Sequence, residues 1–216
     1  MNIYPSVLET SSETFKKRLT DYGNIFPHLQ IDVADGIYVD NTTISLGELL
    51  KIFGSRTSFA EDHTIELHLM VQDPQQYIQT IKEINSSIPV TRLLLHIDQV
   101  QIIDFQNYEF QVGLVLNPEH SVDTYWDMLS QVQTIQIMTI SPGKQGQPFL
   151  PETIGKISQL REKGFTGEII LDGGMNEKNL DYIIKNSRDL PDTICPGSYF
   201  HADAEKKLAR LNRLLP

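Results

Sequence analysis

The chain has little cysteine and no long apolar run. Its single cysteine, Cys195, cannot form an internal disulfide, which suits a reducing compartment. No apolar run approaches the roughly 20 residues of a membrane span. The N-terminal MNIYPSVL also differs from a signal peptide, because it has no basic start followed by a long apolar stretch. We therefore expect a cytoplasmic protein that does not cross a membrane.

Positive charge is also scarce. The 18 lysines and arginines stand against 28 aspartates and glutamates, which gives a formal net charge of -10. No basic stripe of the kind that binds nucleic acid is visible. A phosphorylated small molecule is compatible with this charge, because backbone amides bind phosphate locally. We expect a small-molecule ligand, and neither nucleic acid nor a membrane as a partner.

Short apolar runs alternate with longer amphipathic runs along the chain. Several of the short runs are apolar nearly throughout, as strands buried on both faces must be. The expected strands are residues 2–8, 28–34, 64–70, 91–97, 109–116, 134–140, 167–172 and 192–196. Helices are expected at 12–23, 73–86, 121–132, 150–164, 175–187 and 201–215, with weaker patterns at 45–53 and 99–105 and a polar loop at 54–63.

Eight strands alternating with helices in about 200 residues are typical of a (β/α)8 TIM barrel. We predict this α/β fold, as a single domain over residues 1–216. A doubly wound open sheet is the alternative, but it usually carries a G-x-G-x-x-G motif after its first strand. The chain has no such motif.

Three expected strands end on or near a residue that can carry chemistry: Asp32 in LQIDVADG, His68 in IELHLM and Asp172 in IILDGG. The carboxyl ends of parallel strands meet at one edge of a barrel, where the active sites of this fold lie. Two carboxylates and one imidazole suffice to bind a divalent metal ion and to move a proton on and off carbon. These three residues are the candidate site.

Each of the three also has a purely structural interpretation. Asp32 fits a turn-capping role with the following Asp35-Gly36. His68 fits a satisfied core residue, with Glu66 on the same strand face as its orienting partner. Asp172 before two glycines also describes an ordinary turn. Their common position at three strand ends favours the functional interpretation.

Glycine-rich loops follow the last three strands, at MTISPGKQGQPF (138–149), after Asp172, and at CPGSYF (195–200). The loops after the seventh and eighth strands of this fold often form a phosphate site. Glycine also lets a phosphate approach the backbone closely. Each loop alone fits ordinary turn chemistry as well. The residues placed for phosphate are Gly173, Gly174, Gly197 and Ser198.

The chain resembles the ribulose-phosphate 3-epimerases, and the resemblance covers essentially its whole length. The motifs that carry it, in order, are IYPSVL, IDVADGIYVDN, LHLMVQDPQQYI, LLLHID, VGLVLNP, MTISPGKQGQPF, ILDGGM and PGSYF. It implies that D-ribulose 5-phosphate and D-xylulose 5-phosphate are interconverted by inversion at C3. This reaction serves pentose phosphate recycling and carbon fixation alike, so the pathway stays open.

The resemblance also implies residue roles. Asp32 matches the group that removes the C3 proton, and Asp172 the group that returns one to the opposite face. Both aspartates match ligands of a divalent metal ion that neutralises an enediolate, and His68 matches a histidine ligand. The matches to substrate or phosphate contacts are Ser6, His68, Gly143, Lys144, Gln145, Gly146, Gly173, Gly174, Gly197 and Ser198, of which 143–146 form a flexible loop over the phosphate. A homo-oligomer is also implied.

Gln30 departs from the family, which has a second metal-binding histidine at this position. An amide oxygen is a weaker ligand than imidazole and suits Mg²⁺ or Mn²⁺ better than Zn²⁺ or Fe²⁺. The substitution predicts weaker metal binding, a different metal (zinc, iron, manganese, cobalt or magnesium) or none. It leaves Gln30 a doubtful ligand.

Other departures lie in and beside the expected site. Ala34 replaces a methionine, Asp40 replaces a proline, and Lys144-Gln145 replaces the Phe-Gly of the loop over the phosphate. These changes leave two alternatives open. One is a 3-epimerase of a hexulose 6-phosphate such as allulose 6-phosphate. The other is a barrel that binds a phosphorylated ligand without catalysis.

Overall fold

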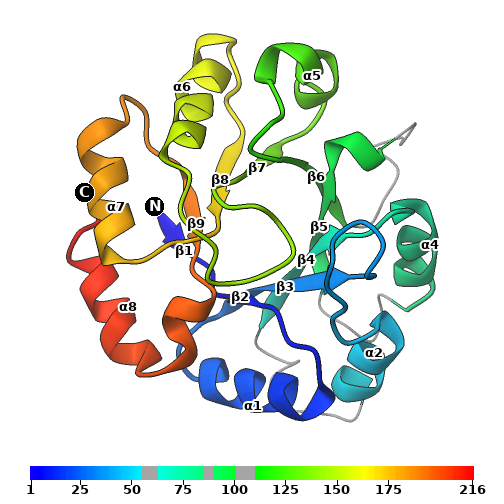
Figure 1. Cartoon of the computed structure of the whole chain (residues 1–216). Coiled ribbons are helices and arrows are strands. Elements are labelled where there is room, and N and C mark those ends of the chain that lie inside the picture. Colours follow the sequence, from blue (N-terminus) through cyan, green and yellow to red (C-terminus); the bar gives the residue numbers. More distant parts are fainter. Residues whose placement is uncertain (55–62, 85–89, 101–109) are drawn as a thin grey trace.

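The strands form one parallel sheet that curls round on itself, with the helices on its outside (Figure 1). The computed structural model describes residues 1–54, 63–84, 90–100 and 110–216. Within these ranges the sheet order is β1-β9-β8-β7-β6-β5-β4-β3-β2. The strands are β1 (Asn2–Ile3), β2 (Ser6–Val7), β3 (His28–Ala34), β4 (Thr64–Met70), β5 (Val90–His96), β6 (Gln111–Leu116), β7 (Thr134–Met138), β8 (Glu168–Asp172) and β9 (Thr193–Cys195).

The first predicted strand is interrupted, and its two halves close the barrel. β1 pairs with β9, and β2 pairs with β3. Between them, the Tyr4 amide donates to the Ile194 carbonyl at 3.0 Å, and the Pro5 carbonyl accepts from the Gln30 amide at 3.1 Å. Pro5 has no N–H to donate, which explains the break. The closed ring confirms the (β/α)8 barrel and excludes the open, doubly wound sheet.

Within the described residues, seven of the eight predicted helices are confirmed, and those predicted at 121–132 and 201–215 are shorter than expected. They are α1 (Ser12–Gly23), α2 (Leu46–Gly54), α4 (Pro74–Ile84), α5 (Val122–Leu129), α6 (Gly155–Glu162), α7 (Glu177–Asn186) and α8 (Ala204–Asn212), with short 3-10 helices η2 (Ile97–Gln99), η3 (Pro151–Ile154) and η4 (Ser198–His201). Ser11 caps α1 by accepting from the Thr14 amide, and Asn176 caps α7 in the same way. Most of the predicted helix 99–105 and of the polar loop 54–63 lies outside the described residues.

Side-chain alternation along the strands separates the two sides of the barrel wall. On β3, Leu29, Ile31 and Val33 belong to the large apolar cluster that the outer helices cover. Gln30 and Asp32, which alternate with them, face the barrel interior. Because side chains alternate along β3, its apolar residues pack against the outer helices and its polar residues point to the centre of the barrel. Within the described ranges, no helix is both long and apolar enough to span a membrane.

Candidate active site

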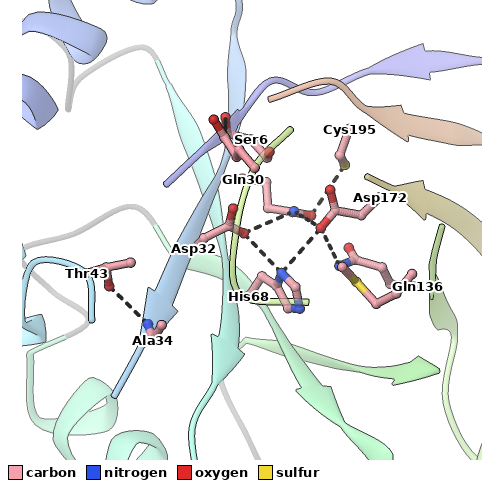
Figure 2. Close-up of polar contacts among 12 residues, drawn as sticks. Ser6, Gln30, Asp32, Ala34, Thr43, His68, Gln136, Asp172 and Cys195 are labelled. Atoms are coloured by element: carbon pink, nitrogen blue, oxygen red, sulfur yellow. Dashed lines mark hydrogen bonds and ion pairs between the residues drawn. The ribbon is translucent and has the colours of Figure 1, made fainter. Parts of the chain in front are cut away.

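Asp32, His68 and Asp172 meet inside the barrel at the carboxyl ends of β3, β4 and β8 (Figure 2). Asp32 and His68 are register partners on adjacent strands. His68 Nδ1 lies 3.0 Å from Asp32 Oδ1 and 3.4 Å from Asp172 Oδ2. One ligand atom from each residue lies within 4.8 Å of the others. The structure therefore brings together the triplet that the sequence predicts.

The turn-capping interpretation of Asp32 is wrong, because its neighbour Asp35 has that role. Asp35 Oδ1 accepts from the amides of Ile37 and Tyr38 at 2.8 and 2.9 Å. Asp32 faces His68 instead and is 5% exposed. Its carboxylate is thus available to the interior of the barrel.

Burial and mutual charge set the protonation of the triplet. Burial raises the pKa of Asp32 to about 6, with the nearby charge of Asp172 adding to it and the hydrogen bond from His68 opposing it. Burial alone would lower the pKa of His68. Its hydrogen bonds to Asp172 and Asp32, and their charges, outweigh burial and raise that pKa to about 9. Without a metal ion, the centre is an imidazolium held between two carboxyl groups.

Gln30 turns the nitrogen of its side-chain amide toward both aspartates. Gln30 Nε2 lies 3.0 Å from Asp172 Oδ2 and 3.4 Å from Asp32 Oδ1. Its oxygen accepts from the thiol of Cys195 at 3.3 Å on the other side (Figure 2). Burial raises the pKa of that thiol well above its usual value, so it stays protonated and keeps its donor role. In this arrangement Gln30 is a hydrogen-bond donor to the carboxylates.

Two further residues that were not part of the candidate site join the centre. Gln136 Nε2, on β7, donates to Asp172 Oδ2 at 3.1 Å. His96 Nε2, on β5, lies 2.9 Å from His68 Nε2, and burial keeps the pKa of His96 well below its usual value, with the charge of His68 adding to the effect. A buried glutamine in the apolar run TIQIM is the signal that would have identified Gln136.

Glu66 is not the orienting partner that was expected for His68. Glu66 Oε2 lies 3.1 Å from Arg92 Nη1 and 3.6 Å from His28 Nε2. Arg92 Nη2 in turn lies 2.7 Å from Glu168 Oε2. One pleat of two residues separates Glu66 from His68, which places this buried ion-pair cluster nearer the amino ends of the strands. The ion-pair cluster of Glu66 therefore belongs to the interior of the barrel and is not part of the candidate site.

A cavity of about 260 Å³ opens above the triplet. Met70 and Met138 contribute apolar wall to it. Gln30 is not part of its lining and lies buried behind the carboxylates. Every other residue predicted for the site lines this one pocket: Ser6, Asp32, His68, Gly143, Lys144, Gln145, Gly146, Asp172, Gly173, Gly174, Gly197 and Ser198.

The Asp-Gly-Gly turn after β8 requires its glycines. Gly173 and Gly174 have φ values of 112° and 66°, which side chains other than glycine rarely adopt. A Cβ on Gly173 would also collide with the side chain of Ile140. The turn thus presents bare backbone to the pocket directly after Asp172.

The loop between β7 and η3 crosses the mouth of the pocket and contacts both sides. On one side, Lys144 Nζ lies 2.9 Å from Asp40 Oδ2, and Asn41 Nδ2 donates to the Gly143 carbonyl at 2.8 Å. On the other, Gln145 Nε2 reaches the Ser6 carbonyl at 3.4 Å. We call residues 143–146 the lid loop. The two substitutions Asp40 and Lys144 are therefore partners of one another.

A divalent cation fits the donor set of the triplet. Two carboxylate oxygens and one imidazole nitrogen converge, and all three residues are buried. Such mixed oxygen and nitrogen ligands suit zinc and the other first-row metals.

Comparison with known proteins agrees with this geometry. A family model described as the ribulose-phosphate 3 epimerase family matches residues 2–200. The chain belongs to this family. The ribulose-phosphate 3-epimerase of Schizosaccharomyces pombe is 29% identical over 211 residues, covering 95% of this chain and 90% of the relative. That of Bacillus subtilis is 28% identical over 193 residues, covering 84% and 82%.

Solved structures with the same barrel are more distant in sequence. The 3-hexulose-6-phosphate synthase of Salmonella typhimurium superposes with a TM-score of 0.68 at 11% identity, covering 100% of this chain and 98% of that one. Orotidine 5'-phosphate decarboxylase of Pyrococcus horikoshii gives 0.62 at 14% identity, covering 99% of each. At these identities the likeness supports the fold alone.

Proposed function

We propose that this member of the ribulose-phosphate 3-epimerase family interconverts D-ribulose 5-phosphate and D-xylulose 5-phosphate. The observation that carries the proposal is the pair of buried carboxyl groups, Asp32 and Asp172, which come from different strands to one pocket. Inversion at carbon needs a group that removes a proton from one face and a group that returns one to the other. Asp32 and Asp172 provide both.

In this mechanism Asp32 accepts the C3 proton and Asp172 donates one to the opposite face. A raised pKa makes Asp32 a stronger base than an ordinary aspartate, which favours removal of a weakly acidic C–H proton near neutral pH. Asp172 accepts hydrogen bonds from Gln30 and Gln136, which fix the direction of its carboxyl group. His68 lies between the two aspartates, and its contacts with both fix the position of one carboxyl group relative to the other.

Asp32, His68 and Asp172 would hold a divalent metal ion at this centre. When bound, such an ion supplies positive charge that stabilises the negative charge developing on the substrate oxygens, an effect of several kcal/mol. Gln30 presents its nitrogen to this position, so it would have to turn its amide over to become a ligand. A site of three protein ligands, without Gln30, is therefore our proposal. Because this set contains one imidazole and not two, we expect it to bind zinc or iron more weakly than a site with a second histidine would.

The phosphate end of the substrate would lie beyond the triplet, against exposed backbone of the last two loops. Gly173, Gly174, Gly197 and Ser198 line the pocket there. Ser6 lies on β2, lines the same pocket and would contact substrate. The net negative charge of the chain does not oppose this, because backbone amides provide the local positive field.

The two alternatives are not favoured. Both relatives compared by sequence above are ribulose-phosphate 3-epimerases, whereas 3-hexulose-6-phosphate synthase shares only the fold, at 11% identity. Both aspartates of a catalytic pair are also present. Three expectations remain predictions: a single domain over residues 1–216, a homo-oligomer, and a cytoplasmic location. The last agrees with a charged substrate that does not cross a bilayer unaided.

Separate replacement of the two aspartates by asparagine tests the proposal. Because each carries one proton transfer, Asp32→Asn and Asp172→Asn should each lower kcat on D-ribulose 5-phosphate by roughly 10²- to 10⁴-fold. The surface variant Asp123→Asn, on α5, is the matched control. Melting temperature and circular dichroism should stay near the wild-type values. A variant of either aspartate that keeps near-full turnover would exclude the mechanism.

A further inference from the structure

The two ring nitrogens of His68 face opposite surroundings. Nδ1 points to the two aspartates, 3.0 Å from Asp32 Oδ1 and 3.4 Å from Asp172 Oδ2 (Figure 2). Nε2 points away from them and lies 2.9 Å from Nε2 of His96, on β5. Both imidazoles are buried. Only Nδ1 is therefore placed to become a ligand between the carboxylates, and Nε2 needs a partner of its own.

The contact between the two histidines assigns one of them as donor and the other as acceptor, because two nitrogens at this distance share one proton. A histidine that binds a metal ion through Nδ1 carries its proton on Nε2. His68 must then be the donor and His96 the acceptor. If His96 were the donor instead, the proton of His68 would lie on Nδ1 and would occupy the place of the metal ion. The acceptor role of His96 therefore decides which nitrogen of His68 is free to bind.

The ring of His96 is held in place by aromatic packing and by the segments around it. It packs against His68 and against Tyr38, at centroid distances of 5.0 and 4.8 Å. The Tyr38 hydroxyl donates to Asp98 Oδ1 at 3.0 Å and accepts from Asn117 Nδ2 at 2.7 Å. These contacts join the segments that follow β3, β5 and β6 around one ring. The position of His96, and through it the direction of His68, is thus fixed from outside the triplet.

The acceptor role leaves the remaining proton of His96 on Nδ1, which also needs a partner. Among the described residues, His96 Nδ1 and Asn117 Oδ1 are both buried and both lack a hydrogen bond. Asn117 is a neighbour of His96, where it partly offsets the lowering of the His96 pKa by burial and by the charge of His68. A turn of the amide or of the ring would pair the two atoms. The second nitrogen of His96 therefore has an acceptor close by, which permits Nε2 to accept.

We propose that His96 is a positioning residue, which accepts the Nε2–H of His68 and so directs Nδ1 of His68 to the metal position between the aspartates. The inference rests on the proposed function, because it concerns the proposed ligand set of Asp32, His68 and Asp172. His96 is not among the described residues that line the pocket, so it acts through His68 and not on the substrate. Metal-binding histidines commonly donate their other N–H group in this way, and loss of the acceptor lowers metal affinity about 10- to 100-fold.

The metal affinity of the full-length, metal-free protein tests this role, with Zn²⁺ as the probe and a chromophoric chelator as the competitor. His96→Leu removes the acceptor and should lower the affinity about tenfold or more. His96→Gln supplies an amide oxygen as acceptor and should stay within about threefold of the wild type. His28→Leu is the matched control, because His28 lies at the amino end of β3 and contacts Thr64, and its loss should leave the affinity unchanged. A loss in His96→Gln as large as in His96→Leu, or no loss in His96→Leu, would overturn the assignment.

NMR of the ring nitrogens of His68 is the second readout, and it stays informative if His96→Leu fails to fold, because it uses the wild type. In the Zn²⁺-loaded protein, Nε2 of His68 should carry a proton that is protected from exchange with solvent, and Nδ1 should carry none. A proton on Nδ1, or an Nε2 without one, would overturn the role of His96.

Neither readout depends on turnover, so the two proposals can fail separately. Zinc binding in the expected order by a protein that does not epimerise D-ribulose 5-phosphate would refute the proposed function and leave the role of His96 standing. Absence of Zn²⁺ binding by the wild type would overturn the role of His96, whether or not the protein turns over its substrate.

Discussion

Gln30 faces the carboxyl groups of Asp32 and Asp172, the proposed acid/base pair, with an amide nitrogen. The family motif has a histidine at this position. The thiol of Cys195 fixes the amide in this direction from behind. An imidazole at the same place would offer a nitrogen lone pair to a metal ion between Asp32 and Asp172. The identity of this one side chain therefore decides whether the centre has three or four protein ligands.

We predict that Gln30→His raises the affinity for Zn²⁺ by at least roughly tenfold. Mutation of residues that merely hydrogen-bond to a metal ligand already changes metal affinity by this factor or more. Affinity for Mg²⁺ should change much less, because that ion prefers oxygen. Competition of the metal-free protein with a chromophoric chelator measures both. Gln136→His is the matched control, since Gln136 donates to Asp172 alone of the two aspartates. Equal zinc affinity in the wild type and in Gln30→His would contradict the three-ligand assignment.

Metal binding should also displace protons from the centre. The pKa of His68 is raised to about 9 and that of Asp32 to about 6, and a ligand must lose its proton to bind metal. Between these two values one proton leaves His68, so the apparent metal affinity should rise about tenfold per pH unit. It should rise more steeply below about pH 6 and level off above about pH 9.

Calorimetry in buffers of different ionisation enthalpy counts the released protons directly. One proton per metal ion near neutral pH is the expected result. An affinity that does not change with pH between the two pKa values would show that His68 is neutral in the metal-free protein, against the account given above.

At the scale of elements, the bounds of a strand were predicted well where its residues form a clear run of alternating inward and outward side chains. β3 and β4 have the predicted bounds, and the placement of Asp32 and His68 follows from them. Residues 2–8 were predicted as one strand, but Pro5 has no N–H for the ladder and divides it. Sequence pattern identifies a strand from its side chains, whereas its continuity depends on backbone donors.

Contacts between distant elements could not be predicted in this way. Lys144 and Asp40 are 104 positions apart, and their pairing appears only when the lid loop crosses the loop after β3. The partner of Glu66 was also mistaken, because strand face alone does not tell which neighbouring strand supplies the contact. Arg92 comes from β5, which is beside β4 in the closed sheet.

The ion-pair cluster of the barrel interior should be a stability element. Glu66 is fully buried, so Arg92→Met would leave its carboxylate without its nearest cation. Breaking a buried pair in this way costs about 3–5 kcal/mol. Urea unfolding of Arg92→Met against wild type measures the free energy of unfolding.

The matched control is Arg188→Met. Arg188 pairs with Glu162 and Asp189 at the surface, where its side chain is 62% exposed. Its loss should cost no more than about 1 kcal/mol. Equal losses from the two variants would show that the interior cluster contributes no more than an exposed pair.

At the scale of the whole molecule, closure of the barrel creates the site. Gln30 and Asp172 are 142 positions apart, and they are brought within hydrogen-bonding distance because β1 and β2 join β9 to β3. The same barrel occurs in solved enzymes of other names at 11% and 14% identity. The function of this chain therefore depends on the side chains at the strand ends, which the fold holds in position.

The most direct test of the two-aspartate mechanism is to follow the C3 hydrogen by NMR during turnover of D-ribulose 5-phosphate in D₂O. Asp172 exchanges its proton with solvent, so D-xylulose 5-phosphate formed early should carry deuterium at C3, while the remaining substrate keeps protium. Asp172→Asn should form little product. Product that retains the original C3 proton would contradict the account, because a single group would then have carried that proton from one face to the other.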